Sequence, residues 1–127
     1  MLLDLLSEYL GNVEATIRKL EGAYIEHYEE DILANNRVNL RIRLRFPSGY
    51  LLELNEAAIV ETGRIRHLGY RYHLQDGQNN LVFRYDNTPH FPEVKSFPHH
   101  KHLPDKVVST KEPSIFQIIE EASRVAR

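Results

Sequence analysis

Residues 84–102, RYDNTPHFPEVKSFPHHKH, hold the densest group of side chains that could do chemistry. Four of the chain's seven histidines lie in this segment, with an arginine, an aspartate and a lysine near its ends. A histidine can give or take a proton near neutral pH, and a neighbouring carboxylate can fix which ring nitrogen carries it. The segment therefore predicts an acid–base or anion-binding site, with the candidates Arg84, Asp86, His90, His99, His100, Lys101 and His102.

The histidines of this segment allow three interpretations. In the first, they exchange protons at a phosphodiester, and His73 is the partner of one of the histidines at 99–102. In the second, three side chains bind a metal, chosen from Asp86, His90, His100 and His102, although their spacing matches no established zinc signature. In the third, the histidines and Asp86 hydrogen-bond the loop backbone and hold the loop closed. We retain the first interpretation and expect no metal and no cofactor.

Prolines and aromatic residues define the conformation expected for this segment. Each proline fixes its own φ and pushes the preceding residue to extended geometry, so a helix is excluded. The aromatic residues are expected to pin an otherwise polar loop to the core, and loops held on a scaffold are where sites usually lie. These residues are Pro89, Pro92 and Pro98, with Tyr85, Phe91 and Phe97.

Hydrophobic periodicity predicts the elements that must position this loop. Apolar residues recur every three or four positions over residues 2–20, which indicates a helix with a weak point at Gly11–Asn12. A second helix is expected from Pro113, which suits its first position. Alternation predicts strands at 23–32, 37–46, 50–60, 65–74 and 81–86, with a short extended piece near Val107–Val108.

These elements define an α+β fold. We expect an antiparallel meander of about five to six strands, with the N- and C-terminal helices packed on one face. A chain of 127 residues predicts a single domain, residues 1–127. The other face of the sheet is then exposed, or half covered by the loop at 84–102.

That exposed face is predicted to be cationic, although the whole chain carries a formal net charge of −2. Guanidinium groups match phosphate oxygens in pairs, so a phosphodiester backbone is the expected ligand. The alternative is that the arginines only keep the face solvated and deter edge pairing. The strand order places on this face Arg41, Arg43, Arg45, Arg71, Arg84, His67 and His73, with Glu53 and Asp86 as its acids.

Composition excludes several classes of protein. The chain has no cysteine, so disulfides and thiolate chemistry are excluded. No apolar run approaches the roughly 18 residues that a membrane helix needs. The start, MLLDLLSEYL, has no basic region typical of a signal peptide, so we expect a cytoplasmic protein. Phosphate-binding loops, dinucleotide fingerprints, nucleophile elbows and HExxH zinc motifs are absent.

Three motifs resemble one known family. They are YRYHLQD at 70–76, LVFRYDNTPHFPE at 81–93 and FPHHKH at 97–102. Together they are similar to the TumE family, small toxins of bacterial and archaeal toxin–antitoxin pairs. The resemblance implies a partner, a small helix-turn-helix antitoxin. It leaves open whether the toxin is a monomer, a homodimer or part of the antitoxin complex.

The resemblance and the cationic face together predict a toxin that acts on RNA or on translation. By analogy with small toxins that cleave RNA without a metal, we expect an endoribonuclease-like site of arginine and histidine. Phosphate would be bound by Arg41, Arg43, Arg45, Arg71, Arg84 and Lys101. His73 and His100 or His102 would exchange protons, and Asp86 would orient one of them. The alternatives are a non-catalytic protein that binds nucleic acid or a partner through the same face, and a metal-dependent hydrolase.

Overall fold

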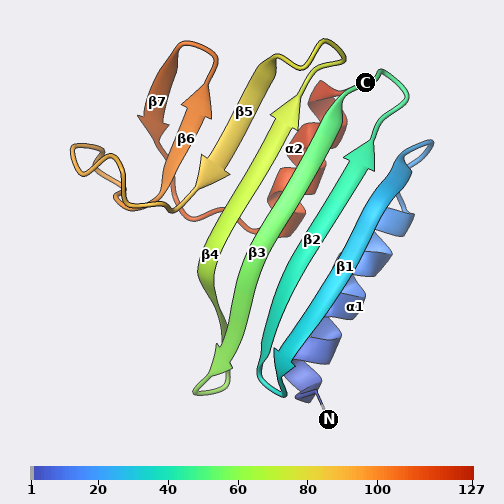
Figure 1. Cartoon of the computed structure of the whole chain (residues 1–127), viewed down its shortest axis with the longest axis vertical. Coiled ribbons are helices and arrows are strands. Elements are labelled where there is room, and N and C mark those ends of the chain that lie inside the picture. The colour runs from blue at the N-terminus through green and yellow to red at the C-terminus, as the bar shows by residue number, and fades with distance from the viewer. Residues whose placement is uncertain (1) are drawn as a thin grey trace.

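A seven-stranded antiparallel sheet dominates the computed structural model, which describes residues 2–127 (Figure 1). Each strand pairs with the next along the chain, so the sheet is a simple meander. The strands are β1 (Tyr24–Ala34), β2 (Arg37–Arg45), β3 (Leu51–Glu61), β4 (Arg64–Gln75), β5 (Leu81–Asp86), β6 (His100–Leu103) and β7 (Lys106–Ser109).

Two helices, α1 (Asp4–Arg18) and α2 (Ile115–Val125), lie behind the same face of the sheet (Figure 1). Helix α1 continues through Gly11, which lies on the helix surface with nothing near its α-carbon. Helix α2 begins with a capping box, in which Ser114 and Gln117 bond each other's backbone N–H groups. Pro113 therefore precedes the N-cap and lies two residues before Ile115, the first helical residue, rather than at the first helical position as we expected. Among residues 2–127, no helix has the length and apolarity needed to cross a membrane.

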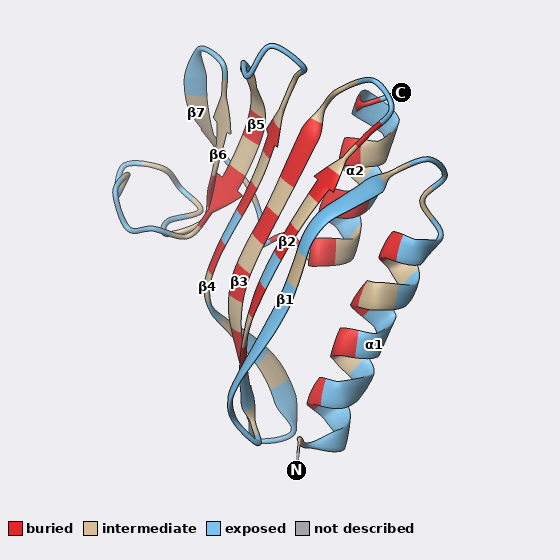
Figure 2. Cartoon of the chain, turned by 45° about the vertical axis from the view of Figure 1, so that its right-hand side comes forward, coloured by how far each residue is buried: buried red, intermediate tan, exposed pale blue. Residues whose placement is uncertain are grey.

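The core forms between the helices and one face of the sheet. Burial alternates along β2 and β3, which Figure 2 shows as buried bands separated by lighter ones. Leu40, Leu54 and Tyr72 are fully buried on this face, and Leu6 of α1 and Ile118 of α2 close over it. The tyrosines of β4 and β5 are core residues, as their alternation predicts: Tyr70, Tyr72 and Tyr85.

The α+β meander is confirmed, but it has seven strands rather than five to six. The segment at 84–102 is also shorter as a loop than predicted, because residues 84–86 end β5 and residues 100–102 begin β6. The prolines keep the chain out of the hydrogen-bond ladder only as far as Pro98. Beyond Pro98 the N–H groups are available, and β6 pairs with β5. The irregular part is residues 87–99.

A bulge in β4 corrects two further expectations. The pairing of β3 with β4 shifts between Ala57 opposite Gly69 and Ala58 opposite His67, so Leu68 is the extra residue. A one-residue shift exchanges the two faces of a strand. His67 therefore lies on the helix-covered face rather than the polar face. Leu68, which simple alternation with Tyr70 and Tyr72 would place in the core, is instead 36% exposed.

Candidate functional site

Two rows of side chains cross the polar face of the sheet, because residues directly opposite each other on neighbouring strands point the same way. We call this surface the polar face. The first row runs Arg41, Asn55, Arg71, Asp86 and His100, and the second runs Arg43, Glu53, His73, Arg84 and His102. The meander thus gathers most of the predicted site residues from five strands.

Asp86 and His100 form a buried pair at the end of the first row. His100 Nε2 lies 2.8 Å from Asp86 Oδ1, and the two residues are only 2% and 6% exposed. His100 Nδ1 lies 2.9 Å from the carbonyl oxygen of Pro98. A carbonyl oxygen and a carboxylate can only accept, so each contact uses a ring N–H of His100. His100 is therefore held on both sides, by the Pro98 carbonyl and by Asp86.

His102 is the more accessible histidine of this cluster. Its Nε2 lies 3.5 Å from Asp86 Oδ2, and its side chain is 21% exposed. Burial lowers the pKa of His102, and the nearby His100 and Arg84 lower it further. Asp86 acts in the opposite direction, and the net shift of the His102 pKa is downward. A lowered pKa leaves the ring neutral at physiological pH, with a lone pair that can accept a proton.

The loop at 87–99 covers this cluster through one aromatic ring. The ring of Phe91 packs edge-on against His100 and His102, at centroid distances of 5.0 and 5.6 Å. Phe97 remains 45% exposed and does not pin the loop. Phe91 therefore covers part of the cluster, and the side chain of His102 remains partly exposed.

Asp86, His100 and His102 are also the residues that could hold a metal, because their ligand atoms lie within 4.8 Å of one another. Two features of the site weigh against a cation. The 2.8 Å contact between Asp86 and His100 is a hydrogen-bond distance, and a ring nitrogen that donates its proton to a carboxylate has no lone pair for a metal. Arg71 and Arg84 flank Asp86, across the strand pair and along its own strand, and would repel a cation.

His73 supports an arginine instead of offering a free nitrogen. Its Nδ1 accepts a hydrogen bond from Arg84 Nε at 3.2 Å, and its Nε2 lies 3.0 Å from Gln75 Oε1. Burial is the largest cause and lowers the pKa of His73. The Gln75 bond raises it, the charges of Arg84 and Arg71 lower it further, and the net direction is downward. The neutral ring thus fixes the direction of the Arg84 guanidinium.

The arginines of the polar face fall into two groups. Glu26 of β1 accepts from Arg43 Nε and Arg45 Nε, both at 2.9 Å, and these bonds lower the pKa of Glu26. We had expected the acids of β1 to lie away from this face. Within residues 2–127, Arg41 and Arg71 have no carboxylate at ion-pair distance. Burial and the charge of Arg71 lower the pKa of Arg84, as in a site where cations crowd together.

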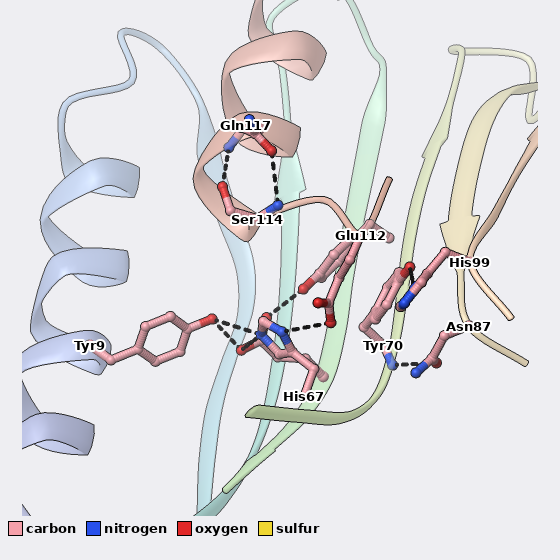
Figure 3. A network of polar contacts seen from close by, with 10 residues as sticks. Tyr9, His67, Tyr70, Asn87, His99, Glu112, Ser114 and Gln117 are labelled. Carbon is pink, nitrogen blue, oxygen red and sulfur yellow. Dashed lines mark hydrogen bonds and ion pairs between the residues drawn. The ribbon is translucent and has the colours of Figure 1, made fainter. Parts of the chain in front are cut away.

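Three other predicted residues lie apart from this cluster. His90 is exposed in the loop. His99 stacks on Tyr70 on the helix side, with its Nδ1 2.8 Å from the Tyr70 hydroxyl (Figure 3). Lys101 points to the helix-covered face, where its Nζ lies 3.1 Å from Glu121 Oε2 of α2. The basic charge of Lys101 is thus unavailable to a ligand on the polar face.

A polar network that the sequence did not predict joins α1 to the sheet (Figure 3). The Glu56 side chain is fully buried and accepts from the hydroxyls of Tyr9 and Tyr72. Burial and the Glu56 charge raise the pKa of both tyrosines. His67 Nε2 lies 3.3 Å from Glu56 Oε2, and His67 Nδ1 lies 3.6 Å from Glu112 Oε1. Burial lowers the pKa of His67, but the two glutamates outweigh it and the net direction is upward.

The network is structural in character. It ties α1, the bulge in β4 and the segment before α2 to one buried carboxylate. The side chains of its members point toward the helix layer, away from the polar face. Glu56 has a recognisable signal in the sequence, because it stands in phase with Leu52, Leu54 and Ala58 on the buried face of β3.

The protein is a small antiparallel sheet with the two terminal helices on one face. Arginine and histidine side chains gather on the other face. The family model described as toxin TumE matches residues 14–126. The chain therefore belongs to the TumE toxin family, as its motifs suggest, and a toxin of this kind implies an antitoxin partner. No curated protein and no solved structure matches the chain significantly.

Proposed function

We propose that this toxin cleaves RNA on its polar face by acid–base chemistry that needs no metal. The observation that carries the proposal is the position of two cationic side chains, Arg71 and Arg84, beside the Asp86–His100–His102 cluster, with Arg41 two strands beyond Arg71 in the same row. Guanidinium groups with no acid partner attract phosphate, and a neutral histidine next to them can accept a proton from a ribose hydroxyl.

In this mechanism the scissile phosphate binds between Arg71 and Arg84. His102 accepts the proton of the ribose 2′-hydroxyl, and the 2′-oxygen forms a bond to phosphorus. The bond from phosphorus to the 5′-oxygen breaks, and the leaving oxygen takes a proton from water. The products carry a 2′,3′-cyclic phosphate and a 5′-hydroxyl. The guanidinium groups stabilise the charge that develops on the phosphate oxygens.

The remaining residues of the cluster position these groups. His100 donates to Asp86, which offsets the Asp86 charge and leaves the arginine charges available to phosphate. Asp86 in turn lies beside His102. His73 directs Arg84. We further propose that the antitoxin is a small helix-turn-helix protein, as the resemblance of the motifs implies.

The two groups of arginines provide a matched test. We expect Arg41→Ala to weaken binding of single-stranded RNA and to lower the salt dependence by about one phosphate contact, a slope change of roughly 0.7. Arg43→Ala removes the same charge from the same strand, but this charge already faces Glu26 and Glu53. We expect Arg43→Ala to change RNA affinity much less. Fluorescence anisotropy of a labelled RNA across a salt series measures both, and equal losses in the two variants would contradict the proposal.

A non-catalytic binding protein is the second candidate. The observation that favours it is that His73 and His100 each have both ring nitrogens engaged, which leaves His102 alone for proton transfer. In that case arginine substitutions lower affinity for RNA or for a protein partner, and substitution of His102 has little effect on toxicity.

A further inference from the structure

A hollow of about 530 Å³ lies on the polar face between β2, β3, β4 and the residues that follow β5. Its floor is made by Ala57 and Gly69, which are opposite each other and are too small to fill the space above them. Arg41, Asn55 and Arg71 of the first row form one wall. The volume is within the range of small-molecule sites, roughly 300–1,000 Å³.

Amide side chains line this hollow beside the two arginines. Asn39 lies next to Ala57 across the strand pair, Asn55 lies between the arginines, and Asn87 closes the end near Gly69. Asn87 Oδ1 accepts from the backbone N–H of Tyr70 at 3.1 Å, so the Asn87 amide is fixed with its NH₂ group still able to donate (Figure 3). An amide offers one donor and one acceptor group, which is the pattern needed to pair with the edge of a nucleobase.

One polar atom of Asn39, a residue that lines the hollow, has no hydrogen-bond partner. In the part of the chain that the structure describes, Asn39 Oδ1 is the buried side-chain polar atom that lacks a hydrogen bond. A buried acceptor without a partner is costly, and native proteins rarely leave one without a ligand or a water. A site for phosphate alone would not use an acceptor, because phosphate oxygens are acceptors themselves.

We propose that this hollow is a base-recognition subsite, which holds one unstacked base of the RNA substrate over Ala57 and Gly69. The base lies against the flat floor, the guanidinium planes of Arg41 and Arg71 stack on it or hold its phosphate, and the asparagine amides read its edge. Proteins commonly recognise single-stranded RNA by such splayed bases. The inference rests on the proposed function, because the subsite would select where the RNA is cut. Gly69 lies two strands from His102 and four residues away along the strand direction, about 16 Å by strand geometry.

Gly69 allows a steric test that spares the fold. A β-carbon added at Gly69 meets only Asn87 Oδ1, at 4.0 Å, and valine suits a strand. Gly69→Ala therefore fits without a clash, and the γ-carbons of Gly69→Val are expected to fill more of the hollow. The probes are the four nucleoside 5′-monophosphates and ribose 5-phosphate, which has the same phosphate and sugar but no base. Binding is followed by NMR chemical-shift titration of the purified protein.

We expect at least one nucleotide to bind wild-type protein about tenfold more tightly than ribose 5-phosphate, as a good bidentate base contact supplies. In Gly69→Val this nucleotide should bind no better than ribose 5-phosphate, whose own affinity stays unchanged. Gly69→Ala should be intermediate. If all four nucleotides bind wild type like ribose 5-phosphate, or if Gly69→Val keeps the difference, the inference is wrong. RNA cleavage is measured separately. Discrimination among nucleotides without RNA cleavage would contradict only the proposed function. RNA cleavage without discrimination among nucleotides would contradict only the subsite.

Discussion

Replacing His102 with alanine is expected to lower the rate of RNA cleavage by about 10²-fold or more and to abolish growth arrest. His102 is the histidine of the cluster that combines partial exposure with a lowered pKa, so its loss removes the proposed base. The cleavage rate of purified protein and the growth of an induced bacterial host measure the effect. Thermal unfolding of the variant should match wild type, because the side chain is at the edge of the buried cluster.

The pH dependence of wild-type cleavage tests the same residue. A general base acts only when unprotonated, and the pKa of His102 lies below its ordinary value of 6.5. The rate should therefore stay level as pH falls through 6.5 and decline only below it.

His27→Ala is the matched control for His102→Ala, since His27 lies opposite Arg43 on the same face but pairs with Glu29. Equal loss of cleavage in both variants, or none in His102→Ala, would rule out His102 as the base.

Replacing Glu56 with alanine is expected to lower the free energy of unfolding by about 3 kcal/mol. The substitution leaves the buried hydroxyls of Tyr9 and Tyr72 without an acceptor and leaves His67 without its nearer carboxylate. These groups join α1 to the sheet, so the loss should appear in a cooperative urea transition monitored by circular dichroism.

Glu53→Ala provides the control on the same strand. Glu53 faces the other side of β3 with its side chain 33% exposed, and its contact with Arg43 is 3.9 Å long. An exposed pair of this kind contributes roughly 1 kcal/mol or less. If both variants unfold at the same urea concentration, the buried network does not have the structural role that we assign to it.

The elements with strong periodicity were predictable from the sequence. The alternation of β2 places its arginines on one face of the strand and Leu40 and Ile42 on the other. A shift of the strand by one residue would bury charge, so the sequence determines which face of β2 is buried. The two helices and the meander follow from the same patterning. Strands β6 and β7 were missed as a hairpin because each has only four residues, too few for a period to stand out against the neighbouring prolines.

The candidate site was predictable in kind but not in detail. The histidine-rich motif predicts where the chemistry would lie, and β5–β6 pairing does bring Asp86 to His100 and Arg84 to His102. Periodicity did not reveal the bulge at Leu68, which takes His67 out of the polar face. It also did not reveal that Glu26 reaches across from β1 to Arg43, because ion pairs depend on side-chain reach between strands rather than on spacing within one.

The most direct test of the central claim is the chemistry of RNA ends after incubation with the purified toxin in the presence of a chelator. We predict that single-stranded RNA is still cut, and that the new ends carry 2′,3′-cyclic phosphate and 5′-hydroxyl groups. If the protein arrests growth but the RNA stays intact, RNA cleavage is not the activity of the toxin. Cleavage that the chelator abolishes would contradict the metal-free mechanism and would return Asp86, His100 and His102 to the role of metal ligands.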